Sequence, residues 1–273
     1  MSKRDRTWTE EKIAKYIKAG RGLGEGRHYK PWLTVQDVPA NSRAHRIPGN
    51  KIGRTHHLMS DIERDYFYIL DWLDEVIDIR EQFPLERELT TKIAEQKNIK
   101  HSVDVKTRTP LVMTTDFLIT LRRDNKVFHI ARTIKPAEKL NDPRVIEKFE
   151  IEREYWATKN VSWAIATERG MPTVLCGNLE AIRSYLHVDE ETQEVAGEFL
   201  RYLSKSKAST LSEAFREFEQ MHFLESGAAL LCFKHLLIAK TISINLSERI
   251  NLHMKLEEIQ IRTEREHITR WAT

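Results

Sequence analysis

The alternation of apolar and polar positions divides this chain into an α/β first part and a helical second part. Residues at helical spacing predict helices, and period-two alternation between turn residues predicts strands. We predict helices at 8–19, 60–75, 90–97 and 142–160, and strands at 76–85, 111–121, 127–135 and 162–168. Residues 27–56 follow neither pattern and are predicted to be irregular. This order of elements is typical of an α/β fold with a mixed sheet.

From about residue 171 the pattern becomes mostly helical. Three further helices are predicted, at 189–203, 210–220 and 225–240. The segments TISINL and RINLHM then alternate on either side of a Ser-Glu pair, which predicts a hairpin. Three helices followed by a hairpin is the order of a winged helix, a module that binds DNA or docks other proteins. We therefore predict two domains, residues 1–170 and 171–273.

Composition narrows the class of protein. The 273 residues are 40% hydrophobic and 31% charged, which is typical of a globular protein. No run of about 18 apolar residues predicts a membrane span, and the leading MSKRDRTWTEEK lacks an apolar signal region. These features predict a cytoplasmic protein without a membrane partner. Two cysteines, Cys176 and Cys232, are too few for a zinc cluster or a disulfide framework.

Charge permits nucleic-acid binding without requiring it. The net charge is +3, and the first 60 residues carry many basic and few acidic side chains. Such a segment is as often a solvated arm as a binding surface.

One glutamate of the predicted 60–75 helix lies on its apolar face. At about 100° per residue, Glu63 falls between Leu70 and Phe67 inside the apolar arc. A carboxylate in that position is costly unless it is paired or binds a metal. A salt bridge to an arginine at the edge of the core is an equally good explanation of Glu63 taken alone.

Polar residues also interrupt the two strands within MTTDFLITLRRDNKVFHIARTIKP, residues 113–136. Because strand side chains alternate between faces, Thr133 and Lys135 share one face. A turn centred on Asp124 and Asn125 places Asp116 opposite Thr133, with Lys135 as a diagonal neighbour. An acid, a second polar residue and a lysine are thus predicted to meet on one face.

This set of residues suits metal-dependent hydrolysis of a phosphodiester. Carboxylates hold Mg²⁺, which prefers oxygen ligands and keeps several waters. The metal activates a water and stabilises charge on a phosphate, and a lysine can orient the water or neutralise that charge. An acid, a spacer and (D/E)-x-K is the layout of the restriction-endonuclease-like nucleases.

Long segments of the chain resemble the TnsA family, the endonuclease subunits of heteromeric cut-and-paste transposases. They run in order through residues 10–170 as GRGLGEGRHYKPWLTVQDVP, RAHRI, GRTHHLMSDIERDYF, DIREQFPL, TTDFLIT and IKP. The segment LSEAFREFEQMHFLESGAALLCFKHLLIAKTISINL is similar to the family's helical second domain.

The resemblance implies a restriction-endonuclease-like PD-(D/E)xK domain followed by a mainly helical, winged-helix-like domain. It implies Mg²⁺-dependent cleavage of the 5′ strands in double-stranded DNA at transposon ends. A DDE-type partner of the TnsB kind would cut and join the 3′ ends, and an AAA+ ATPase of the TnsC kind would regulate the assembly. Two Mg²⁺ ions per site are expected, with Mn²⁺ as a substitute.

Carried over by motif, Glu63 and Asp116 would bind the metal and Lys135 would be catalytic. The backbone carbonyl of Ile134 would also face the metal. The sequence departs from the pattern at Thr133, where many nucleases of this fold have an acid. Its hydroxyl can bind a metal-bound water but brings no charge. We expect an active site that includes Thr133.

Weaker candidates for DNA contact lie in polar segments: His56, His57, Lys100, His101, Arg43, His45 and Arg46. For the two adjacent histidines a structural role is an open alternative. Two other functions also remain open. One is a restriction or repair nuclease that works alone, and the other is a non-catalytic adaptor whose site has lapsed at Thr133.

Overall fold

A computed structural model describes residues 6–38 and 43–262. The chain forms two compact units, one ending at Met171 and the other beginning at Pro172. In the first unit the helices are α1 (Glu10–Lys18), α2 (Asp61–Trp72), α3 (Arg87–Gln96) and α4 (Pro143–Thr158). Its strands are β1 (His45–Pro48), β2 (Thr55–Leu58), β3 (Val76–Pro84), β4 (Thr114–Arg123), β5 (Lys126–Ile134) and β6 (Ser162–Ala166). The predicted helices and strands of this unit are confirmed, with ends shifted by a few residues.

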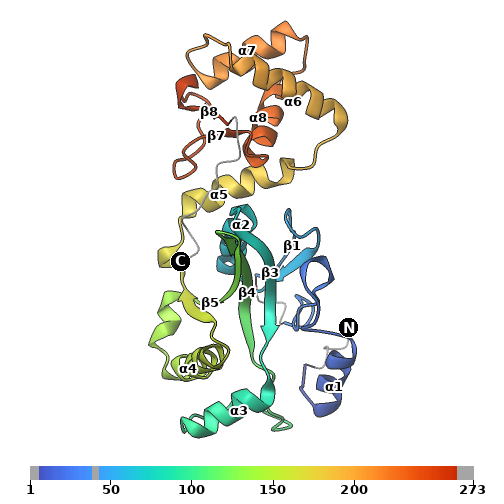
Figure 1. Ribbon diagram of the computed structural model, residues 1–273, viewed down its shortest axis with the longest axis vertical. Coiled ribbons are helices and arrows are strands. Elements are labelled where there is room, and N and C mark those ends of the chain that lie inside the picture. The colour runs from blue at the N-terminus through green and yellow to red at the C-terminus, as the bar shows by residue number, and fades with distance from the viewer. Residues whose placement is uncertain (1–5, 39–42, 263–273) are drawn as a thin grey trace. The chain divides into compact units, whose positions relative to one another are not determined.

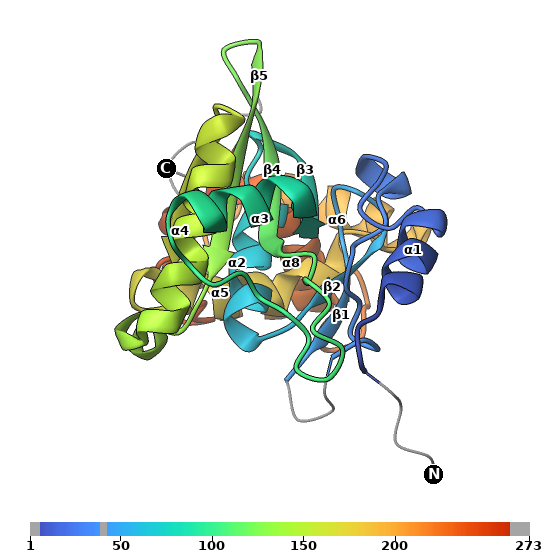
Figure 2. The ribbon, with the colours of Figure 1, turned by 90° about the horizontal axis from the view of Figure 1, so that it is seen from below.

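A four-stranded mixed sheet in the order β3-β4-β5-β6 forms the centre of the first unit (Figure 1). β3, β4 and β5 are antiparallel neighbours, and β6 runs parallel to β5 after the α4 crossover. Asp124 and Asn125 make the β4–β5 turn with φ of 50° and 61°, as a two-residue hairpin requires. Figure 2 shows the end of this hairpin projecting beyond the sheet. The mixed sheet and the position of the turn are confirmed.

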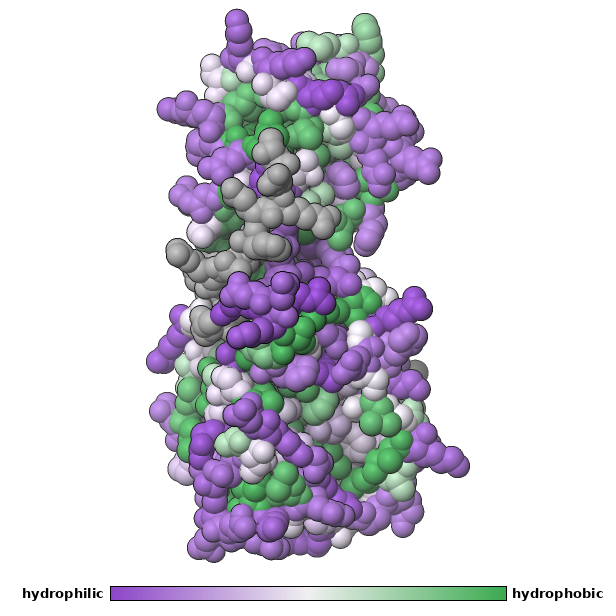
Figure 3. Space-filling view, viewed as in Figure 1, coloured by the Kyte–Doolittle hydropathy of each residue, from purple (hydrophilic) through white to green (hydrophobic). Residues whose placement is uncertain are grey.

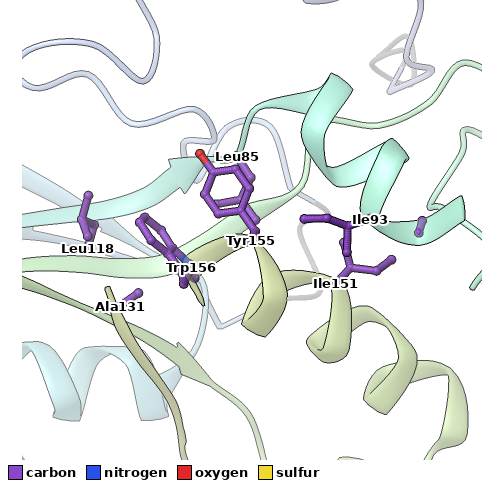
Figure 4. Packing of buried hydrophobic residues seen from close by; sticks show 8 residues of the cluster. Leu85, Ile93, Leu118, Ala131, Ile151, Tyr155 and Trp156 are labelled. Carbon is purple, nitrogen blue, oxygen red and sulfur yellow. The ribbon is translucent and has the colours of Figure 1, made fainter. Parts of the chain in front are cut away.

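Helices cover both faces of the sheet. α3 and α4 pack on one face, where Leu118 and Ala131 of the strands lie near Trp156 of α4, and Ile93 of α3 lies near Ile151 of α4 (Figure 4). α2 packs on the other face, where the rings of Tyr66 and Phe117 lie 5.7 Å apart. The sheet is therefore buried on both sides, and polar side chains between these layers need partners.

Residues 45–58 contain a short hairpin that we predicted to be irregular. β1 and β2 pair antiparallel over only four residues each, too few for a clear alternation. A distant partner fixes the hairpin: Arg54 and His56 both donate to the fully buried Glu81 of β3 at 2.5 and 2.9 Å. The prediction was wrong because an ion pair with β3, and not a local pattern, determines this structure.

The second unit is mainly helical. It contains α5 (Thr173–Ile182), α6 (Glu190–Leu203), α7 (Leu211–Met221) and α8 (Ala228–Ile238), with two short strands, β7 (Ile242–Ser243) and β8 (Gln260–Ile261). The helices at 189–203, 210–220 and 225–240 are confirmed, whereas α5 was not predicted.

The predicted TISINL–RINLHM hairpin is wrong. β7 pairs instead with β8, in which Gln260, the partner of Ser243, lies 17 residues further along the chain. Backbone carbonyls of the expected second strand have other partners, because Leu252 and Met254 accept from the first residues of α7. The amide of Asn178 holds the intervening loop through the carbonyls of Leu246 and Glu248.

None of the helices in the described part of the chain is long and apolar enough to cross a membrane. Hydrophilic side chains cover most of the face in Figure 3, with smaller hydrophobic patches between them.

Candidate active site

Glu63 occupies the first turn of α2 and is only 5% exposed. Ser60 caps this helix by accepting from the Glu63 N–H. In return the Glu63 carboxylate accepts from the Ser60 hydroxyl at 3.1 Å and from the Met59 N–H at 2.8 Å. This variant of a capping box fixes the carboxylate. The predicted inward placement of Glu63 is confirmed.

Asp116 lies near the start of β4, where the backbone pairing with β5 has ended and the Asp116 side chain contacts the β5 backbone instead. Its Oδ2 accepts from the Ile134 N–H at 2.7 Å, and its Oδ1 accepts from the Gln82 amide at 3.2 Å. The β4–β5 register ends with Phe117 opposite Arg132, so Asp116 lies one position beyond the last pair. Thr133 was predicted to meet Asp116 on one face, but its hydroxyl is bonded to Glu152 of α4 instead. Each carboxylate oxygen of Asp116 is thus oriented by one donor and retains capacity for another ligand.

Gln82 supports Asp116 from the neighbouring strand. It is 3% exposed and has a left-handed φ of 48°, which is uncommon for a residue other than glycine. Its amide donates to Asp116 and accepts from the Thr114 hydroxyl at 3.3 Å. Its carbonyl accepts from the Trp32 N–H at 3.2 Å. The surrounding contacts hold Gln82 in this conformation, and such conformations cluster at functional sites.

Glu63 and Asp116 form a pair of acids with little compensating charge. Burial, and then the charge of Asp116, raises the pKa of Glu63. Burial also raises the pKa of Asp116, against the opposing effects of the Ile134 N–H and the Lys135 charge. Lys135 follows β5 and is partly exposed, and its charge acts on both acids. The structure therefore brings Glu63, Asp116 and Lys135 into one electrostatic cluster.

Thr133 faces a third acid, Glu152 of α4. Its hydroxyl donates to Glu152 Oε1 at 2.5 Å and accepts from the Trp163 indole at 3.0 Å. Thr115 donates to the same Glu152 oxygen at 2.6 Å. Burial raises the pKa of Glu152 to about 7, although both threonine hydrogen bonds oppose the shift. In this conformation the Thr133 hydroxyl holds Glu152.

Glu152 and Gln82 are site residues that our sequence reasoning missed. Glu152 lies between Phe149 and Trp156 on the buried side of α4, so the test that found Glu63 would have found it. Gln82 gives no such signal, because its backbone conformation is not visible in the sequence. Strict strand alternation also fails nearby, because Thr115 and Leu118, three positions apart on β4, both reach the α4 side.

The candidate DNA-contacting histidines lie mostly inside the protein. His56 is 0% exposed and bonded to Glu81, which is the arrangement expected of a structural residue. Burial lowers the pKa of His57 and of His101, so both favour the neutral form. His45 is bonded to Asp61 at 2.7 Å.

The basic candidates are more accessible. The Arg43 side chain is 84% exposed and pairs with Asp61 at 2.9 Å, and Arg46 and Lys100 are exposed as well. Arg43 thus pairs with an acid of the same first turn of α2 that carries Glu63.

The acids suit a hard divalent cation. No group of three His, Cys, Asp or Glu side chains within 6–38 and 43–262 could enclose a metal. Mg²⁺ does not require one, since it is commonly held by one or two carboxylates with the remaining ligands as waters. The raised pKa values of the buried Glu63 and the half-buried Asp116 mean that their negative charges are poorly compensated, which a bound cation would correct. The side chains of Glu63 and Asp116 therefore fit Mg²⁺.

Both units of the chain are similar to known proteins. A family model described as TnsA-like endonuclease N terminal matches residues 73–168, and one described as TnsA endonuclease C terminal matches residues 171–246. The transposon Tn7 transposition protein TnsA of Escherichia coli is 44% identical over 204 residues, which cover 75% of this chain and 72% of that protein.

The chain belongs to the TnsA family.

Family membership confirms the predicted resemblance and makes the chain an endonuclease subunit of a transposition system. The N-terminal TnsA match includes Gln82, Asp116, Thr133, Lys135 and Glu152 but begins after Glu63. The assignment of Glu63 therefore depends on its burial and on its electrostatic coupling to Asp116.

Proposed function

We propose that this TnsA family member is a Mg²⁺-dependent endonuclease that cleaves the 5′ strands at the ends of a transposon. A DDE-type transposase subunit would cut and join the 3′ ends, and an AAA+ ATPase would regulate the assembly. The observation that carries the proposal is the pair of carboxylates of the buried Glu63 and the half-buried Asp116, each oriented by hydrogen-bond donors and both within the field of the Lys135 charge.

Each residue has a role that follows from its contacts. Glu63 and Asp116 bind the cation, since both carboxylates are oriented by donors that hold them in place. The cation supplies an activated water and stabilises the phosphate charge. Lys135 is partly exposed beside them, so its ammonium group can orient the attacking water or neutralise charge on the scissile phosphate.

Residues around this centre keep it in position. The Ile134 N–H and the Gln82 amide hold the two oxygens of Asp116. Glu152 is bonded to Thr115 on β4 and Thr133 on β5, so it ties together the two strands that carry Asp116 and Lys135. The Ile134 carbonyl as a metal ligand, a second ion, and Mn²⁺ as a substitute belong to the proposal as well.

Thr133 does not favour a lapsed site. An adaptor that had lost catalysis would not need a buried Glu63 and a half-buried Asp116 acting on each other, because acids taken out of water without a partner cost stability. Here both acids are retained and oriented, and the threonine hydroxyl is used in the Glu152 network. The non-catalytic adaptor is therefore the weaker candidate.

Product type in a reconstituted transposition reaction tests the proposal. The reaction would contain the full chain, its two partner subunits and a donor plasmid with labelled 5′ strands. Asp116→Ala removes one metal-binding acid. Glu138→Ala is the matched control, because Glu138 is a 77% exposed acid close in sequence to Lys135. Wild type and the control should release the element and give simple insertions, whereas Asp116→Ala should leave the 5′ strands joined to the donor and give fused products.

Identical products from wild type and Asp116→Ala would exclude this site as the cutting site and favour the adaptor. Cleavage of bare DNA by the purified chain without partners would favour a nuclease that works alone. Both outcomes differ from a folding failure, which the thermal midpoint of each variant would reveal.

A further inference from the structure

A cavity of about 300 Å³ lies between α1 and the segment that follows it, within the first unit. Its lining contains four basic side chains and one carboxylate: Arg6, Lys12, Lys15, Arg21 and Asp37, together with Tyr16 and Gln36. The sequence singled out this region as basic, but the active site uses none of these side chains. Lys12, Lys15 and Tyr16 share one face of α1, because residues three and four apart are neighbours on a helix.

The carboxylate in this cavity is already satisfied. Asp37 accepts from Arg21 at 2.6 Å, from the Tyr16 hydroxyl at 2.8 Å, and from the N–H and hydroxyl of Thr34 at 2.9 and 2.7 Å. Although burial alone would raise it, bonds from Arg21 and Thr34 hold the pKa of Asp37 at about 2. Asp37 thus acts as a fixed part of the wall that orients Arg21 and compensates one of the four positive charges.

Aromatic rings hold two of the four basic side chains, Arg21 and Lys12. The Arg21 guanidinium lies 3.8 Å from the centre of the Tyr16 ring. The Lys12 ammonium lies 4.4 Å from the Trp8 ring centre. Both Arg21 bonds to Trp32 O and Asp37 come from Nη1, and a guanidinium has further donors on Nε and Nη2. Arg21 and Lys12 are therefore held in position in the cavity wall, and the exposed Lys15 completes the positive lining.

Acids of the same helix do not line the cavity. Glu10 is paired with Arg87 of α3 at 2.8 Å, and neither Glu10 nor Glu11 is part of the lining. An excess of positive charge in a concave site attracts anions, and its preformed donors suit the oxygens of a phosphate.

We propose that this cavity is a subsite for one backbone phosphate of the DNA, separate from the scissile phosphate at Glu63 and Asp116. The inference rests on the proposed function, since it takes DNA as the ligand. It adds a contact that positions the duplex without reading its sequence.

The cavity is linked to the active site by a short series of contacts. Tyr16 packs against Trp32 with ring centres 5.4 Å apart. The Trp32 N–H donates to the Gln82 carbonyl, and the Gln82 amide donates to Asp116. A phosphate held between Lys12 and Lys15 therefore lies at a fixed offset from the metal-binding acids, which sets where along the strand the cut falls.

The test is equilibrium binding of the full chain to a labelled blunt duplex, measured by fluorescence anisotropy over a series of KCl concentrations. EDTA prevents cleavage, so the result does not depend on whether the chain is a nuclease. Lys15→Gln removes a lining charge. Lys18→Gln is the matched control, since Lys18 is another exposed lysine of α1 but does not line the cavity. Both variants change net charge equally.

We expect Lys15→Gln to reduce the slope of log affinity against log salt by about one, as loss of a phosphate contact does. Lys12→Gln/Lys15→Gln should weaken binding further, and equally for two duplexes of unrelated sequence. Lys18→Gln should leave the slope close to that of wild type. Lys15→Arg keeps the charge and should retain binding, which separates loss of the contact from damage to α1.

Three results would overturn the proposal. The first is an equal effect of Lys15→Gln and Lys18→Gln, which would indicate general charge. The second is a loss restricted to one duplex sequence. The third is that wild type binds inorganic phosphate in the cavity but shows no salt-dependent binding of the duplex. That result would indicate a small-anion site. If Asp116→Ala leaves products unchanged while Lys15→Gln still weakens duplex binding, the subsite stands and the nuclease assignment fails.

Discussion

Replacement of Gln82 by methionine tests whether its amide sets the metal affinity of the site. Methionine has a similar length and no hydrogen-bonding amide. It is as strained as glutamine at a φ of 48°, so the backbone conformation costs the same in both proteins. Gln82→Met therefore removes the 3.2 Å bond to Asp116 Oδ1 and the bond from Thr114 with little other change.

The size of the effect follows from the two donors that orient Asp116. After Gln82→Met, the carboxylate keeps only the Ile134 N–H at 2.7 Å and can rotate about that bond. Loss of an outer hydrogen bond to a metal-binding residue typically costs about 10- to 100-fold in metal affinity. That range corresponds to about 1.4 to 2.8 kcal/mol of binding free energy.

Calorimetric titration of the full chain with Mn²⁺, without DNA, measures this affinity directly. Gln82→Gly is the companion variant, because it removes the same amide and also relieves the left-handed backbone. Both variants should bind Mn²⁺ more weakly, and Gln82→Gly should have the higher thermal midpoint of the two. An unchanged Mn²⁺ dissociation constant in Gln82→Met would refute the positioning role of Gln82.

Two further variants, Glu81→Gln and Glu152→Gln, probe buried acids, and their stabilities are measured with EDTA present so that no metal is bound. Glu81→Gln leaves Arg54 and His56 without their anion, so the free energy of unfolding should fall by about 3–5 kcal/mol; an effect below about 1 kcal/mol in urea unfolding would contradict this. Bonds from Arg54 and His56 outweigh burial and hold the pKa of Glu81 at about 2, below its ordinary 4.5. The stabilising contribution of Glu81 is therefore complete above pH 4.5 and is lost as pH falls toward 2. Thermal midpoints measured across that pH range would show this loss. Burial raises the pKa of Glu152 to about 7, so the fold favours its protonated form and stability should fall by up to about 3 kcal/mol as pH rises from 4.5 toward 7. Glu152→Gln should reduce that loss, and an equal loss in both proteins would show that Glu152 does not titrate in this range.

The first unit was largely predictable because its strands and helices have strong local patterns. The Asp124–Asn125 turn fixes the β4–β5 register, and that register pairs Phe117 with Arg132, the neighbours of Asp116 and Thr133. Glu63 was found because a carboxylate inside an apolar arc is unusual. The same reasoning applies to Glu152, whose position on the apolar face of its helix is also visible in the sequence, although we did not predict it.

Other features could not be predicted, because they depend on contacts between distant segments. The β1–β2 hairpin is fixed by the bond from Arg54 to Glu81, 27 positions away. Asn178 holds a loop about 70 positions away, where period-two alternation had predicted a strand. The conformation of Gln82 arises from its position opposite Asp116 and beside Trp32, and no local sequence pattern encodes it.

The residues of the site come from α2, β3, β4, β5 and α4, between Glu63 and Glu152. During synthesis from the N-terminus, Glu63 and Asp116 leave the ribosome long before α4 can pack on the sheet. Contacts of such sequence separation form late in folding because closing long loops costs entropy. A nascent or truncated chain that ends before α4 would lack the Glu152 link between β4 and β5, and would be expected to spare the cell's DNA until the whole first unit has folded.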